Sequence, residues 1–451
     1  MRAFRPPAAL ALIISGSVAH AGDGHLAVLI ADALDARPEL AQARADVQAA
    51  QERVPQAESW PDPMLQFGVQ NDSFNKWQVG KMETSWLSFM ATQTIPFPGK
   101  PRLRAEITAV DVTVRRLAVE RVRLSTVAEV HRTYLALQLT RARLELLSRL
   151  SSLLVQAVEA AQARYESGDG PQSDILRARL EVARLEQQRV VLLADEQLRI
   201  AGMNRLRGRA LDEKVTSLPM TQLSFPPAPD LADALKQSFA TSPEYRVAEA
   251  FVGGAERTRE LGQRQYFPDL SVGAGVMVRG GLDPMWTVTL GVPLPVFAAT
   301  KQSRAVAEAD ATIEASERGV EAVAQVLRLR TSERVMYWRA LGEVWNTYQT
   351  RLLTDAEATA AATLTQYRVG KVPLAAVLEA TSATISVLDA SNGVLIDAWR
   401  LRVAQDEASL SEISTNGGSM SSSIPGTGAA RSTGRPTTSP GTGATSGSTG
   451  M

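Results

Sequence analysis

The chain has 451 residues, and its 48 basic and 48 acidic side chains give a formal net charge of zero. This balance argues against a nucleic-acid partner, which requires a basic surface. The absence of cysteine excludes disulfides, thiolate chemistry and a lipid anchor on cysteine. Only three histidines are present, and no group of residues has the spacing of a metal or nucleophile site. We therefore expect no cofactor, no bound metal and no enzymatic activity.

The first 21 residues have the three parts of an export signal. Arg2 and Arg5 give a positive start, AALALIISGSVA forms a short apolar core, and Ala19 and Ala21 fit a small-x-small cleavage site. The apolar run is too short to span a membrane comfortably, which argues against an uncleaved anchor. We predict a signal peptide over residues 1–21 and a mature chain that begins at Gly22.

The sequence that follows contains the same series of motifs twice. Pro-Glu opens a helical stretch at Pro38 and again at Pro243, and a Pro-Asp break follows in WPDPMLQFGVQ and YFPDLSVGAGV. Each copy then has a Pro-x-Pro motif (IPFPGK, VPLPVF), a long helical stretch and a Gly–Pro break (YESGDGP, YRVGKVP). Matches in the same order predict an internal repeat. We place the first copy at residues 22–208, a linker at 209–229 and the second copy at 230–411.

Each copy contains two strand-like runs. They lie at about residues 64–72 and 85–95 in the first copy, and at about 268–279 and 285–292 in the second. Apolar residues alternate with polar or small ones, as in outer-membrane barrel strands, although half-buried strands of a soluble sheet alternate in the same way. The export signal favours the barrel. Four strands cannot close a barrel in lipid, so we expect an oligomer, either a dimer or a trimer.

Two very long helices are predicted, over about residues 101–167 and 299–369. At about 1.5 Å per residue, such a helix is a rod of roughly 100 Å. Its apolar spacing is that of a coiled coil, so helix content alone would favour a periplasmic structural coiled coil with no channel. The strands argue against that alternative. The Gly-, Ser-, Thr- and Pro-rich tail over residues 412–451 is predicted to be disordered.

Over residues 26–411, these ordered motifs resemble the TolC-like outer membrane efflux protein family. The resemblance implies a mainly α protein with a β-barrel: a homotrimer with a 12-stranded barrel in outer membrane lipid and a helical tunnel in the periplasm. It also implies the exit duct of a tripartite efflux pump, with a periplasmic adaptor protein and an inner-membrane pump of the RND type as partners. The duct of a type I protein secretion system is the alternative. WPDP and FPGK resemble the heavy-metal efflux branch, although that branch often carries an N-terminal lipidated cysteine, which this chain lacks.

The two Gly–Pro breaks are predicted to be helix-hairpin turns, because glycine ends a helix in a left-handed conformation and proline starts the next one. The resemblance implies that these tips face the adaptor and that their neighbours close the channel. The predicted adaptor-facing residues are Gly168, Asp169, Gly170, Val369 and Gly370.

The resemblance also implies a gate beside these tips. Asp174 matches a family carboxylate that ties the hairpins together, but the matching base position is Val372, so Lys371 or Arg368 is expected to serve instead. Tyr367 falls near the aromatic residue of the constriction. Of the family's two acidic rings, one falls on Ala376 and is lost, and the other is Glu379. Solvated helix-end charge is the alternative for Asp174, Arg368 and Lys371.

Four methionines lie near the predicted strand ends, at positions 82, 90, 277 and 285. Methionine commonly fills gaps in packing, so packing is favoured over a relay for soft metal ions.

Overall fold

The computed structural model describes residues 24–411, so the predicted signal peptide and tail lie outside the described residues. Both repeats lie within one compact unit. The first repeat contains α1 (Gly24–Ala36), α2 (Pro38–Glu58), β1 (Met64–Gln70), β2 (Trp86–Ile95), α3 (Lys100–Glu166) and α4 (Gln172–Leu206). The second contains α5 (Leu231–Thr241), α6 (Pro243–Arg264), β3 (Leu270–Arg279), β4 (Leu282–Gly291), α7 (Gln302–Thr347), the π-helical η2 (Tyr348–Leu352), α8 (Leu353–Arg368) and α9 (Leu374–Asp406). A short 3₁₀ helix, η1 (Met220–Gln222), lies between the repeats.

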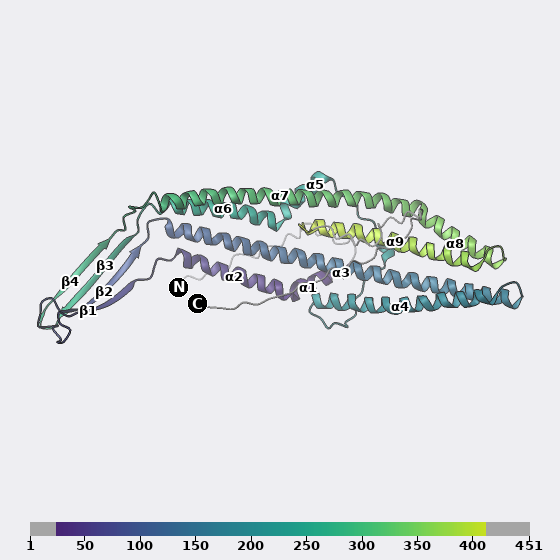
Figure 1. Cartoon of the computed structure of the whole chain (residues 1–451), viewed down its shortest axis with the longest axis horizontal. Coiled ribbons are helices and arrows are strands. Elements are labelled where there is room, and N and C mark those ends of the chain that lie inside the picture. Colours follow the sequence, from purple (N-terminus) through teal and green to yellow (C-terminus); the bar gives the residue numbers. More distant parts are fainter. Residues whose placement is uncertain (1–23, 412–451) are drawn as a thin grey trace, which may run out of the picture. The chain divides into compact units, whose positions relative to one another are not determined.

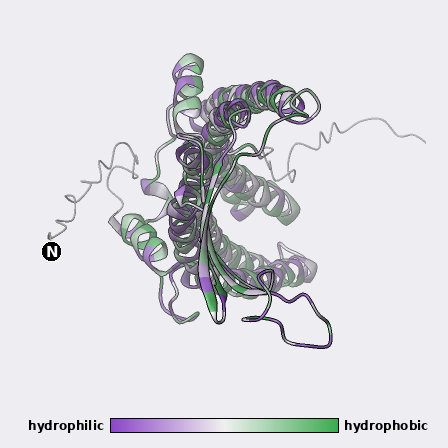
Figure 2. Cartoon of the chain, turned by 90° about the vertical axis from the view of Figure 1, so that its left-hand side faces the viewer, coloured by the Kyte–Doolittle hydropathy of each residue, from purple (hydrophilic) through white to green (hydrophobic). Residues whose placement is uncertain are grey.

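The four strands form one antiparallel sheet in the order β1-β2-β3-β4. The central β2–β3 pair joins the two repeats, with Ile95 opposite Leu270. The outer edges of β1 and β4 have no partner strand among the described residues. Figure 1 shows the sheet at one end of the long helices and their two hairpin turns at the other, and Figure 2 looks from the strand end onto the helices behind it.

The sheet has one apolar face that is exposed and one face that is mostly polar or small. Because side chains alternate along a strand, the pairing register places the apolar residues of all four strands together. The apolar residues are Leu65, Phe67 and Val69 in β1; Leu87, Phe89, Ala91 and Ile95 in β2; Leu270, Val272, Ala274, Val276 and Val278 in β3; and Trp286, Val288 and Leu290 in β4. Gln93 interrupts this face, as the sequence predicts. Trp286, on this face, is 79% exposed in the protomer.

The first long helix, α3, has 67 residues and matches its predicted range to within a residue at each end. The second is not the single α-helix that the sequence predicts. Its π segment, Tyr348–Leu352, separates α7 from α8. Thr347 and Thr350 donate hydroxyl hydrogen bonds to the carbonyls four residues earlier, at 3.0 and 2.8 Å, as Thr133 does within the uninterrupted α3.

Helix α9 is the one helix among residues 24–411 that is long and apolar enough to cross a membrane. Its C-terminal half instead packs against other helices and the linker. Leu395, Ile396 and Trp399 are buried there with Leu135 of α3 and Leu223 of the linker. We therefore assign α9 to the helical core.

Candidate functional site

The two hairpin tips are built in the same way. Gly168 and Gly370 adopt left-handed φ angles of 79° and 74°. The amide of the following residue then bonds five residues back, Asp169 to the Arg164 carbonyl at 2.8 Å and Lys371 to the Gln366 carbonyl at 2.9 Å. This is the Schellman arrangement, which satisfies the last carbonyls of a helix. Each return helix begins directly after its proline, which stands at the N-cap.

Tyr367 lies at the centre of the contacts between the tips. Its side chain is buried, and its hydroxyl donates to Oδ2 of Asp174 at 3.5 Å. Its ring packs with Ala161 and Ile175 of the first hairpin and with Leu374 of the second. Burial and the adjacent Asp174 carboxylate raise the pKa of Tyr367 above its ordinary value. The phenol therefore remains a protonated hydrogen-bond donor at neutral pH.

Arg164 supplies the cation that joins the two tips, and the sequence reasoning missed it. Its guanidinium lies 5.0 Å from the ring centroid of Tyr367 and donates to the Tyr367 carbonyl at 3.4 Å. It also donates to the Asp169 carbonyl at 2.9 Å. The sequence offered one signal: the repeat places the neutral Gln366 opposite Arg164, so only the first tip carries a cation at this position.

The predicted ion pair between Asp174 and Lys371 or Arg368 is not among the ion pairs within residues 24–411 of one protomer. Asp174 meets Tyr367, and Arg368 instead donates to Oε1 of Gln156 at 3.4 Å. Val372 packs against the apolar cluster around Tyr367, which explains why this position needs no base. The residues Arg368, Val369, Lys371 and Glu379 are exposed.

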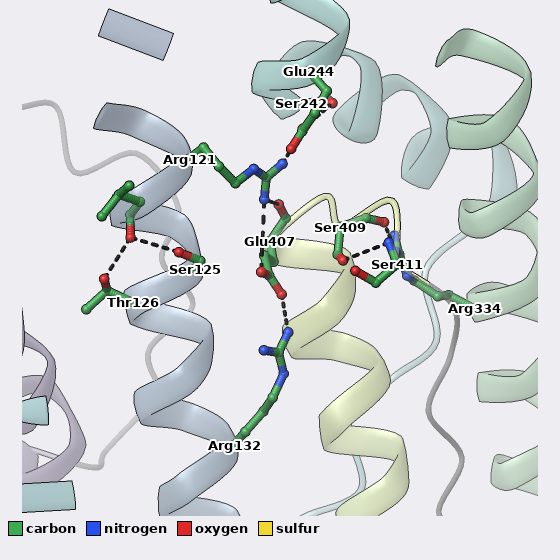
Figure 3. A network of polar contacts seen from close by, with 11 residues as sticks. Arg121, Ser125, Thr126, Arg132, Ser242, Glu244, Arg334, Glu407, Ser409 and Ser411 are labelled. Carbon is green, nitrogen blue, oxygen red and sulfur yellow. Dashed lines mark hydrogen bonds and ion pairs between the residues drawn. The ribbon is translucent and has the colours of Figure 1, made fainter. Parts of the chain in front are cut away.

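A polar network fixes the opposite end of α9 (Figure 3). The carboxylate of Glu407 pairs with Arg132 and lies 4.0 Å from Arg121, and Arg121 in turn pairs with Glu244 at the start of α6. Arg334 of α7 is buried and donates to the Ser409 carbonyl. Burial lowers the pKa of Arg334 to about 10. The end of α9 is thus held by α3, α6 and α7.

A third cluster joins the helices to the sheet and brings together two motifs of the repeat, IPFPGK and YFPD. Asp269 accepts hydrogen bonds from the amide of Phe97 and from Nζ of Lys100, both at 2.8 Å. Lys100 also donates to the Phe267 carbonyl at 2.7 Å, and the rings of Phe97 and Phe267 stack at 4.7 Å. Burial raises the pKa of Asp269, but its hydrogen bonds outweigh that effect and hold it below the ordinary value.

Residues 29–207 match the family of outer membrane efflux proteins. No curated protein matches the chain by sequence. Three solved structures extend the likeness to both repeats of the chain. The outer-membrane channel OprN has a TM-score of 0.72 at 16% identity, over 86% of this chain and 90% of its own. CusC has a TM-score of 0.72 at 16% identity, over 86% of this chain and 92% of its own. VceC of Vibrio cholerae has a TM-score of 0.69 at 17% identity, over 85% of this chain and 95% of its own.

These comparisons confirm the predicted TolC-like fold. The antiparallel sheet and the two long helical hairpins of this chain have the arrangement of the outer-membrane channel OprN and of CusC. At these low identities the likeness concerns the fold alone.

Proposed function

We propose that this efflux protein is the trimeric exit duct of a tripartite efflux pump, with its sheet in the outer membrane and its helices in the periplasm. The observation that carries the proposal is a four-stranded sheet with an exposed apolar face and two open edges, continuous with long helical hairpins. Unpaired backbone groups at those edges are costly in lipid, so the sheet must close with copies of itself. Three copies of four strands give twelve, the number that the family resemblance implies.

The duct conducts passively and catalyses no reaction. Its substrates enter from a periplasmic adaptor and an inner-membrane pump of the RND type, which supplies the energy. Gly168, Asp169 and Gly170 and the opposing Val369 and Gly370 form the adaptor-facing tips, and the Tyr367 cluster closes the channel beside them. Opening requires only that the long hairpins move apart at their tips.

Heavy-metal cations are the substrate class that we propose for this duct. The motifs WPDP and FPGK support it. The face of the sheet opposite the apolar one also carries four methionines at neighbouring register positions. Met277 lies opposite Met285 and is paired with Ser88, two residues from Met90. Met64 is paired with Thr92, which is also two residues from Met90. Thioether sulfur binds soft cations such as monovalent copper.

Fractionation and reconstitution test the duct. We expect heat-modifiable trimers in the outer membrane, and single-channel conductance when purified trimers enter planar lipid bilayers. A soluble periplasmic protein without conductance would refute the duct and favour the structural coiled coil.

Gene deletion tests the substrate class. A strain that lacks the protein should become more sensitive to silver and copper ions. Unchanged metal sensitivity combined with loss of one secreted protein would favour the alternative duct of a type I secretion system.

A further inference from the structure

The contact between the two repeats inside one protomer serves as a template for the contact between protomers. Strand β2 of the first repeat pairs with β3 of the second, and the Phe97–Asp269 cluster lies at the end of this pair. If the proposed trimer closes, β4 of one copy must pair with β1 of the next. The repeat then makes that second junction equivalent to the first.

The internal repeat gives the residue correspondence. Ile95 and Phe97 of IPFP match Val292 and Leu294 of VPLP, 197 residues later. Phe267 and Asp269 of YFPD match Trp60 and Asp62 of WPDP, 207 residues earlier. Because Ile95 pairs with Leu270, Val292 should pair with Pro63 of the neighbouring copy.

This register can be checked against the faces of the strands. It places Leu290 opposite Leu65, Val288 opposite Phe67 and Trp286 opposite Val69. These six residues all lie on the exposed apolar face, so the closed sheet keeps that face continuous. A shift by one residue would turn the apolar side chains of one strand to the opposite face.

The side chains expected at the new junction are exposed in the single protomer. Trp60 is 57% exposed and Leu294 is 73% exposed, whereas their counterparts Phe267 and Phe97 stack on each other. Asp62 is also exposed, whereas its counterpart Asp269 is held by the amide of Phe97. Four additional residues separate VPLP from the next lysine, Lys301, so the lysine of the first junction has no counterpart at the same spacing.

We propose a specific docking site between copies, which rests on the proposed trimer. Strand β4 of one copy pairs with β1 of the next copy, with Val288 opposite Phe67. At the end of this pair, Trp60 packs on Leu294 of the other copy, and the Asp62 carboxylate accepts a hydrogen bond from the Leu294 amide of that copy. The occupant is a second copy of this chain. The repeat supplies the chemistry of the site, since each group has a counterpart that makes the same contact within one protomer.

Cysteine cross-linking tests the register, because the natural chain has no cysteine to interfere. The double variant Phe67→Cys with Val288→Cys should form disulfide-linked dimers and trimers on mild oxidation. The variants Phe67→Cys with Trp286→Cys and Phe67→Cys with Leu290→Cys move the second cysteine by two residues. Diagonal neighbours lie about 7–8 Å apart, beyond the reach of a disulfide, so these variants should remain monomeric on denaturing gels.

A matched control exists inside the protomer. Ala91 and Ala274 are the repeat counterparts of Val288 and Phe67, and they are paired in β2 and β3. Ala91→Cys with Ala274→Cys should therefore form a disulfide within one chain, without linked dimers. This control shows that cysteines at this depth are tolerated and oxidised.

The outcomes separate the inference from the proposed function. Cross-linking by a shifted pair in conducting trimers would overturn the register and leave the duct intact. Absence of any oligomer would overturn both.

For the junction, Asp62→Ala should lower the temperature at which trimers dissociate, whereas Asp212→Ala, at an exposed linker position, should not. Equal temperatures for the two variants would overturn the role of Asp62.

Discussion

Tyr165 and Tyr367 occupy the same position in the two repeats but have different surroundings. Tyr165 is 47% exposed, whereas Tyr367 is 1% exposed and contacts both Asp174 and Arg164. A hydroxyl that loses its water on burial needs a partner, and the Asp174 carboxylate supplies one. One residue type thus forms part of the surface in one tip and joins the two hairpins in the other.

Tyr367→Phe is predicted to raise single-channel conductance. The substitution removes the hydrogen bond to Asp174 and retains the ring that packs under Arg164, so the tips should separate more readily without unfolding. A hydrogen bond to a charged group contributes about 1.5–3 kcal/mol, and the 3.5 Å distance places this one at the low end. Tyr165→Phe is the matched control, and it should leave conductance unchanged. Equal conductance of both variants and the natural protein would argue against a closing role for the Tyr367 hydroxyl.

At the scale of elements, α9 depends on Glu407 for its attachment. This carboxylate is the shared anion of Arg121 and Arg132, and its charge also favours the buried Arg334 cation. The pKa of Arg334 is lowered to about 10 in the folded protein, well below its ordinary value, so the unfolded chain binds more protons in the pH range between the two. By linkage, this group makes stability rise with pH across that window. Below this pH window Arg334 is protonated in both states, and the nearby Glu407 carboxylate stabilises its charge in the folded protein.

Glu407→Gln is predicted to lower the free energy of unfolding by about 3 kcal/mol, because it leaves partly buried cations without their anion. Denaturant unfolding, followed by the fluorescence of the buried Trp338 and Trp399, measures this change. Glu321→Gln removes an exposed ion pair with Arg318 on α7 and serves as the control, with little expected effect. A Glu407→Gln protein as stable as the control would mean that the network does not hold α9.

For the whole molecule, the sequence was informative wherever a short-range pattern decides the structure. Alternation placed Trp286, Val288 and Leu290 on one face, and the glycine–proline breaks predicted both turns. The sequence was uninformative where contacts join segments that are far apart along the chain. Arg164 and Tyr367 are 203 residues apart, and Arg132 and Glu407 are 275 residues apart. The π segment, Tyr348–Leu352, also escaped prediction, because no proline or glycine marks it in the sequence.

In the proposed trimer, three copies of Glu379 would form an acidic ring near the tips and would set the charge selectivity of the channel. The side chain is exposed in the protomer, on the first turns of α9 after Pro373. A ring of carboxylates in a narrow passage favours cations. Glu379→Gln should therefore move the reversal potential in a potassium chloride gradient toward lower cation preference. Glu357→Gln removes an exposed carboxylate from α8 and is the matched control. A duct for metal cations would benefit from such a ring. An identical reversal potential in both variants would show that Glu379 does not line the channel, and it would not argue against the trimer.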